Sequence, residues 1–274
     1  MMRNDISYFV FDTETVADPY LVAHLKYPDE KLEPQEAVLR WQEELQQKTG
    51  NNFIPYTFQI PTAVSIAKIT EEYELLDIIS LGESEFTPAE ITERFWRGWE
   101  KYGRPTFVSF YGRAFDIPLL ELAAFRYGLS LPGWFSPLGK TYDQPRNRYN
   151  QHSHIDLHEI LTNFGATRFT GGLDLAANLI GKPGKTDFSG ALVQELHLKN
   201  RFQEIEDACR CNTLDTYFVF LRTRVLMGLL TLQEEQKLVE KTKLWLETES
   251  AEVPVYAAYI KNWGDWQNPW IPKE

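Results

Sequence analysis

One stretch near the start of the chain limits what this sequence can fold into: apolar residues 9–11 run directly into Asp12, Thr13 and Glu14. Such a run predicts a buried β-strand, and residues two apart on a strand point to the same face. We therefore expect Asp12 and Glu14 to lie side by side, where one cation could bind both. Two carboxylates at the end of a buried strand are costly unless a metal ion or another partner neutralises them. Because Asp-x-Glu arises by chance about once in a chain of this length, the pair alone does not identify a site.

The composition is that of a packed globular protein. Of its 274 residues, 43% are hydrophobic and 14% aromatic, which is enough for one large core. No apolar run reaches the roughly 18 residues that a membrane-spanning helix needs. The first residues lack the apolar segment of a signal peptide. We therefore expect a soluble, cytoplasmic protein without a membrane partner.

Charge and cysteine content exclude some classes of function. The net charge of −11, from 28 basic and 39 acidic residues, argues against a broad surface for duplex DNA, which needs clustered Lys and Arg. It is compatible with an enzyme that grips a short nucleic-acid end locally, because bound metal ions can supply positive charge. Cys209 and Cys211 are the only cysteines, too few for a disulfide framework or a four-ligand zinc site. We interpret them as small buried residues.

The order of predicted elements indicates one mixed α/β domain, in which strands come first and helices follow. Strands at 61–69 and 73–81 should complete an antiparallel meander with the first strand. A strand at 106–110 and a helix at 115–127 supply a βαβ element. We expect this domain to span residues 1–247, and the Trp-rich tail, residues 248–274, to pack back onto it. The other predicted helices are 32–48, a surface excursion, one starting at Pro88, 157–164, 173–180, 189–198, 202–227 and 231–247.

Asp116 is the next candidate acidic ligand. It lies in the first turn of a predicted helix, just after a strand and a loop that contains Gly112. An acidic residue at the start of a helix is ordinary capping and dipole chemistry, and that is the alternative interpretation of Asp116.

Together these motifs resemble a known family. Asp12 and Glu14 on a first strand, followed by the Phe-Asp-x-Pro of residues 115–118, resemble the DEDD 3′-5′ exonucleases of the ribonuclease H-like fold. The chain more closely resembles the predicted exonuclease family related to the proofreading domain of family B DNA polymerases. The resemblance runs from about Tyr8 to Leu229. It implies a mixed central sheet, an antiparallel meander followed by a βαβ unit, with helices on both faces. Further matching stretches are residues 58–65, 154–157, 171–174, 181–185, 214–217 and 221–222; within them we interpret Asp156 as structural.

The resemblance also implies a reaction, two-metal hydrolysis of phosphodiester bonds at the 3′ end of single-stranded DNA or RNA. Asp12 would bridge two Mg²⁺ or Mn²⁺ ions, Glu14 would bind one of them, and Asp116 would hold the other. Hard carboxylate oxygens are the ligands that Mg²⁺ prefers. The candidate substrate-contacting residues are Thr13, Tyr111, Arg113, Phe115 and Lys185; Arg146 and Arg148 are weaker candidates for phosphate contact.

The third motif of the family is altered in this chain. Its Tyr and its Asp, four residues apart on one helix, align with Ala208 and Asn212. Asn retains an acceptor oxygen but no charge, so the site could retain only one ion. Asp215, three residues later, is a possible substitute, but we favour its interpretation as a solvated or interhelical hydrogen-bonding side chain. Two further hypotheses therefore stand beside an active exonuclease: a catalytically degenerate exonuclease fold that binds nucleic acid or a protein partner, and an unrelated soluble metal-dependent hydrolase.

Overall fold

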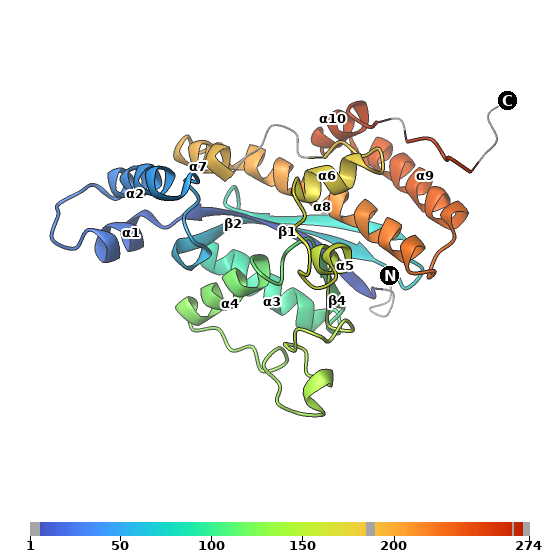
Figure 1. The fold of residues 1–274 in the computed structure, drawn as a ribbon, viewed down its shortest axis with the longest axis horizontal. Helices are drawn as coiled ribbons and strands as arrows, with labels where there is room; N and C mark the ends of the chain where they lie inside the picture. Colours follow the sequence, from blue (N-terminus) through green and yellow to red (C-terminus); the bar gives the residue numbers. More distant parts are fainter. Residues whose placement is uncertain (1–5, 185–189, 265, 271–274) are drawn as a thin grey trace.

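A five-stranded mixed sheet forms the centre of the protein (Figure 1). The computed structural model describes residues 6–184, 190–264 and 266–270. The strand order is β3-β2-β1-β4-β5, in which β1, β2 and β3 form an antiparallel meander and β4 and β5 run parallel to β1. The predicted ribonuclease H-like fold is confirmed. The strands are β1 (Tyr8–Ala17), β2 (Gln59–Ile69), β3 (Leu75–Gly82), β4 (Thr106–Ser109) and β5 (His154–Asp156).

Helices cover both faces of the sheet. On one face lie α3 (Pro88–Lys101) and α4 (Asp116–Tyr127), and on the other α8 (Phe202–Leu226) lies beneath α9 (Leu232–Glu249) and α10 (Val255–Lys261) (Figure 1). Alternate residues of β1 enter the two cores. Phe9 and Phe11 pack with α3 and α4, and Val10 packs with α8. Even-numbered residues of β1 near Val10 therefore face α8. The other helices are α1 (Pro19–Lys26), α2 (Pro34–Thr49), η1 (Tyr56–Phe58), η2 (Thr141–Asp143), α5 (Leu157–Thr162), α6 (Gly172–Asn178) and α7 (Gly190–Leu198).

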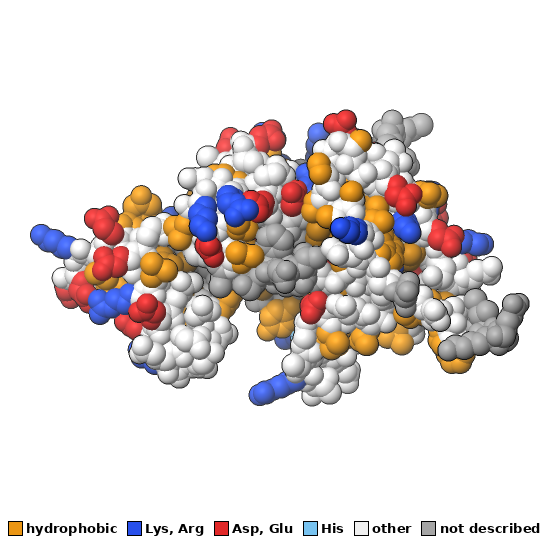
Figure 2. Space-filling view, turned by 90° about the horizontal axis from the view of Figure 1, so that it is seen from above, with side chains coloured by type: hydrophobic (Ala, Val, Ile, Leu, Met, Phe, Trp, Pro, Cys, Tyr) orange, Lys and Arg blue, Asp and Glu red, His pale blue; other side chains and the backbone are white. Residues whose placement is uncertain are grey.

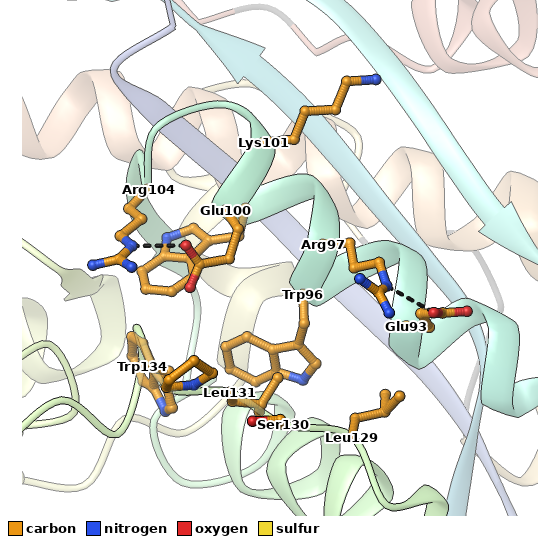
Figure 3. A pocket seen from close by; sticks show the side chains of 12 residues that line it. Glu93, Trp96, Arg97, Glu100, Lys101, Arg104, Leu129, Ser130, Leu131 and Trp134 are labelled. Atoms are coloured by element: carbon orange, nitrogen blue, oxygen red, sulfur yellow. Dashed lines mark hydrogen bonds and ion pairs between the residues drawn. The ribbon is translucent and has the colours of Figure 1, made fainter.

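Three tryptophans consolidate the core beneath α3. Trp96, Trp99 and Trp134 are each about 2% exposed, and their rings lie within 6.2 Å of one another. Each indole N–H has an acceptor inside the protein. They line the floor of the pocket in Figure 3, from which Lys101 points away. Since the rings are covered and their N–H groups satisfied, we assign this pocket a structural role.

The segment between β1 and β2 is a helical excursion with a small core of its own. The sequence predicted α2 but missed α1, which starts where the Asp18 carboxylate accepts hydrogen bonds from the N–H groups of Tyr20 and Leu21. Buried residues that include Val22 and Trp41 hold α1 against α2. The pair projects at one end of the sheet (Figure 1).

Residues after α9 pack against α8. Tyr256 and Tyr259 of α10 are buried, and the ring of Trp263 lies 5.1 Å from that of Phe218. The N–H of Gly264 donates to the carbonyl of Gly181 at 3.0 Å, which fixes the tail beside the loop after α6. In the described ranges, no helix is long and apolar enough to cross a membrane.

The face that carries α7, α9 and α10 mixes acidic and basic side chains (Figure 2). In the part of this face that the structure describes, Lys and Arg do not form a continuous basic surface.

Candidate active site

A cavity opens where β4 leaves the side of β1. Thr106–Val108 of β4 pair with Tyr8–Val10 of β1. Beyond Val10, β1 is paired only with β2, as far as Ala17. The chain turns away after Ser109, and a cavity of about 440 Å³ lies beside the later part of β1. Its walls come from β1, the loop after α2, the loop before α4, α7 and α8. The lining residues are Asp12, Thr13, Glu14, Thr15, Ala17, Gln42, Asn52, Phe53, Ile54, Gln59, Phe110, Tyr111, Phe115, Asp116, Gln194 and Asn212.

Asp12 and Glu14 share one face of β1, as their spacing predicts, and Asn212 on α8 contacts both. The Nδ2 of Asn212 lies 3.2 Å from Oδ2 of Asp12 and 2.9 Å from Oε1 of Glu14. Both interactions are hydrogen bonds in which the amide donates. Glu14 and Asn212 are buried, so the amide partly compensates two carboxylates that the interior would otherwise penalise.

Asp116 is the first residue of α4, and a tight loop brings it to the same cavity. A Cβ at Gly112 would lie 2.2 Å from Oγ of Ser109 and 3.0 Å from Oδ2 of Asp116, so only glycine fits here. Burial raises the pKa of Asp116 well above its usual value, and the nearby charge of Asp12 raises it further. The two carboxylates are thus close enough to interact, although they lie on different elements.

The carboxylate of Asp156 holds this loop in place from behind. Asp156, at the end of β5, accepts hydrogen bonds from the N–H groups of Tyr111 at 3.0 Å and Arg113 at 2.9 Å. It also accepts from the N–H of His158 at 3.0 Å and of Glu159 at 3.4 Å, at the start of α5. One of the residues it holds, Tyr111, has the left-handed φ of 66°. The bonds of Asp156 are consistent with the structural role inferred from the sequence.

We expect Asp156→Asn to loosen this loop, because an amide nitrogen cannot accept the N–H of Arg113. The free energy of unfolding should fall by about 1.5 to 3 kcal/mol, the range for losing a hydrogen bond to a charged group. Chemical denaturation measures it. Asp143→Asn, at an exposed residue of η2, is the matched control and should change little. Equal stability of the two variants would contradict this role.

The aromatic walls of the cavity were only partly predicted. Tyr111 and Phe115 line it, as does Thr13, all three named from the sequence. Phe53 was missed: it lies in the loop after α2, is 48% exposed, and its ring lies 5.8 Å from that of Phe115. Its only signal in the sequence is an aromatic residue following the two asparagines of a polar turn.

Arg113, a candidate substrate contact from the sequence, does not line the cavity. Its guanidinium donates to Oε2 of Glu159 at 3.0 Å and to the carbonyl of His154 at 2.7 Å, and the side chain is 15% exposed. Arg113 therefore ties the loop to β5 and α5. The weaker candidates Arg146 and Arg148 are ion-paired with Glu121 and Glu159. Lys185 lies outside the described residues.

Asp215 does not line the cavity; it makes an interhelical hydrogen bond, the interpretation that the sequence favoured. It is one turn beyond Asn212 on α8, where the hydroxyl of Tyr259 on α10 donates to its Oδ1 at 2.6 Å. Ala208, at the position aligned with the family's Tyr, is buried and brings no hydroxyl to the cavity. Asn212 is therefore the one polar side chain that α8 contributes to the cavity lining in the described part of the chain.

The burial of Asp215 predicts a pH dependence of stability. Burial raises its pKa to about 7, far above the ordinary value of an Asp, so the folded protein retains a proton that the unfolded chain loses. This stabilisation is fully present below the unfolded pKa, near pH 4, and is lost as pH rises towards 7. The loss should be a few kcal/mol, since one pKa unit corresponds to about 1.4 kcal/mol.

The comparison of wild type with Asp215→Asn isolates this contribution. The free energy of unfolding of wild type, relative to that of the variant, should decrease between pH 4 and pH 7. Urea titrations at several pH values measure the difference. Parallel pH profiles for the two proteins would show that Asp215 ionises normally.

The donor set of the cavity suits a hard divalent cation, with three carboxylates and one amide oxygen available. Across residues 6–184, 190–264 and 266–270, however, no three His, Cys, Asp or Glu side chains form a group that could hold a metal ion. The carboxylates surround the cavity without meeting at one point, and the Nδ2 of Asn212 contacts two of them. To receive a cation there, the amide of Asn212 has to turn its oxygen inwards.

Comparison with known proteins identifies a family. The model of a family described as predicted 3′-5′ exonucleases related to the exonuclease domain of PolB matches residues 51–263. The matched part contains Asp116 and Asn212, while Asp12 and Glu14 precede it. No curated protein matches the chain.

Proposed function

Because the chain belongs to the family of predicted 3′-5′ exonucleases related to the exonuclease domain of PolB, we propose that it removes nucleotides from single-stranded 3′ ends. The observation that carries this proposal is the shared cavity: Asp12, Glu14, Asp116 and Asn212 come from three separate elements and line the same space. If these carboxylates were unrelated surface residues, or if Asp116 only capped its helix, there would be no reason for them to line one cavity.

Mg²⁺ or Mn²⁺ is the cofactor that these residues would hold. Asp12, Glu14 and Asp116 would supply carboxylate oxygens and Asn212 its amide oxygen. A bound divalent cation would polarise the scissile phosphate and activate water. With a neutral Asn in place of a fourth carboxylate, we propose weaker cation binding than a four-carboxylate site would give.

The cavity walls suit a single-stranded end better than a duplex. Phe53, Tyr111 and Phe115 offer aromatic surfaces next to the carboxylates, and a terminal base can stack on such rings whatever its sequence. A volume of about 440 Å³ admits one or two nucleotides but no base-paired helix. Thr13 lies between the two acidic residues of β1 and lines the cavity, where its backbone would meet the terminal sugar.

The altered third motif favours a second candidate function. With Ala208 and Asn212 in place of a Tyr and an Asp, the chain could have kept the nucleic-acid site while losing turnover. Such a protein would bind a single-stranded end without degrading it, or would serve a protein partner.

Degradation of labelled oligonucleotides distinguishes these functions. With Mn²⁺, a 5′-labelled single strand should shorten stepwise to a ladder, and a 3′-labelled one should release labelled mononucleotide at once. DNA and RNA of one sequence, each tested with Mg²⁺ and Mn²⁺, define the substrate. A strand blocked at its 3′ end is the control. Binding without shortening would support a site that binds a single-stranded end without turnover. Neither binding nor shortening would contradict both nucleic-acid functions and leave only a role with a protein partner.

A further inference from the structure

A second, much smaller pocket lies further along α8 than Asn212. Its volume is about 70 Å³, and it is enclosed by α8, α9, the loop after α6 and the segment after α10. None of its lining residues lines the candidate active site. The close approach of Gly181 to Trp266 closes one side, because a Cβ at Gly181 would lie 2.6 Å from that of Trp266. The space suffices for a small ion or a few waters.

A buried ammonium group lines this pocket. Lys182 is 6% exposed, and its Nζ lies 4.0 Å from the ring centre of Trp263 and 4.9 Å from that of Phe218. Among the residues that the structure describes, Lys182 has no hydrogen-bond acceptor and no ion-pair partner for this group. The aromatic faces attract the positive charge, but they do not replace the acceptors that a buried ammonium requires.

The neighbouring charges leave an excess of donors. The Nε of Arg222 donates to Oε1 of Glu235 at 2.7 Å, and Gln236 donates to Oε2 of Glu235 at 3.2 Å. Both oxygens of the one carboxylate that lines the pocket are therefore engaged. The terminal nitrogens of Arg222, whose guanidinium carbon lies 4.4 Å from the ring centre of Trp266, add further donors. Two cations thus face one carboxylate around a space that can hold an anion.

We propose that this pocket binds a small oxyanion of the size of phosphate, held by Lys182 and Arg222. Lys contributes a compact charge with three donors, and the terminal N–H groups of Arg match the geometry of phosphate oxygens. Free inorganic phosphate and the terminal phosphate of a nucleotide share this chemistry. The inference does not depend on the proposed exonuclease activity, because the two sites share no residue.

The protonation of Lys182 sets the conditions for a test. Burial lowers its pKa to about 8; Arg222 and Lys243 lower it too, while Glu235 and Asp215 oppose the shift. At pH 6.5 the ammonium group is charged, so an anion should bind. Binding should weaken as pH rises above 8, when the proton is lost.

Thermal unfolding of the full chain in EDTA at pH 6.5 tests the proposal, with phosphate exchanged for chloride at constant ionic strength. Wild type should melt on the order of 5 °C higher when phosphate is present at about a hundred times its dissociation constant. Lys182→Met should lose this rise, whereas Lys101→Met, at an exposed lysine that points away from its own pocket, should keep it. A rise of equal size in all three proteins would overturn the proposal, since phosphate also stabilises proteins non-specifically.

Adenosine 5′-monophosphate distinguishes the two sources of the anion. If phosphate and the nucleotide raise the melting temperature equally, the pocket accepts a phosphate monoester. If only phosphate raises it, the ligand is the free ion. Broadening of the ³¹P resonance by wild type gives a second measurement that does not need a folded variant. No broadening at tens of millimolar phosphate would also overturn the proposal and indicate a pocket filled by water.

Discussion

Asp12→Ala should lower the rate of Mn²⁺-dependent nucleotide removal by about a thousandfold or more, because groups that act as one catalytic unit fail together. Asp12 has the central place in the cavity. It lies on the same face as Glu14, shares the Asn212 amide with it, and raises the pKa of Asp116. Initial rates on a 5′-labelled single strand measure the effect.

Two companion variants make this result interpretable. Asp12→Asn preserves the size of the side chain, so a loss that it shares with alanine is a loss of charge rather than of packing. Asp29→Ala removes an exposed carboxylate that does not line the cavity and should keep the wild-type rate. Activity that survives in both Asp12 variants would place the reaction elsewhere in the molecule.

Asn212→Asp should have the opposite effect on activity and a cost in stability. The change replaces the N–H donor between Asp12 and Glu14 with a further carboxylate. Without a cation, like charges then meet in a buried place, and the melting temperature should fall by several degrees, as for a loss of about 2 kcal/mol. With Mn²⁺, the added charge should strengthen cation binding and raise the rate by about tenfold or more, the equivalent of 1.4 kcal/mol.

The double variant Asn212→Asp, Ala208→Tyr extends this prediction. It restores both residue types of the family's third motif, so its rate should exceed that of Asn212→Asp alone. Strong activity that appears only in the double variant would establish the wild type as a degenerate exonuclease. Asn262→Asp, at an exposed residue after α10, controls for added charge. If Mn²⁺ stabilises Asn212→Asp no more than the control, Asn212 does not face a cation site.

Local pattern was sufficient to predict most of the scaffold. Alternation along β1 placed Asp12 and Glu14 on one face, and apolar runs separated by short turns predicted the antiparallel meander. The glycine loop before α4 predicted that Asp116 starts a helix after a strand. These features depend on neighbours in the sequence. The ribonuclease H-like arrangement, with helices on both faces of the sheet, was anticipated from the resemblance to the exonuclease family. The helix α1 was missed because its start depends on one capping residue, Asp18, rather than on a long periodic pattern.

Partners from distant elements could not be predicted in the same way. Arg113 was expected to meet substrate, but Glu159 and the carbonyl of His154 on other elements engage it. Asp215 was favoured as an interhelical hydrogen-bonding residue, but that its partner is Tyr259 of α10 could not be read from the sequence. Phe53 reaches the cavity because the loop after α2 returns to the side of β1, where its ring lies near that of Phe115. In each case the chemistry of the side chain was evident, and its neighbour in space was not.

For Asn212, the sequence shows the residue type and the structure shows its contacts. Its identity, and the absence of a fourth carboxylate, could be read directly from the sequence. That its amide nitrogen lies within 3.2 Å of both Asp12 and Glu14 is a tertiary fact. This contact shows what the altered third motif changes in the site. The amide nitrogen of Asn212 faces the two carboxylates, whereas a bound cation would require its oxygen there.

A titration with Mn²⁺ tests most directly whether these side chains form one cation-binding centre. The decrease of the EPR signal of the free ion measures the binding. Wild type should take up Mn²⁺, whereas Asp12→Asn and Glu14→Gln should each bind it at least about tenfold more weakly, a change of 1.4 kcal/mol. Asp29→Asn should bind like wild type. Equal Mn²⁺ binding by wild type and by the Asp12 and Glu14 variants would contradict the assignment of this cavity as the metal-dependent reaction centre.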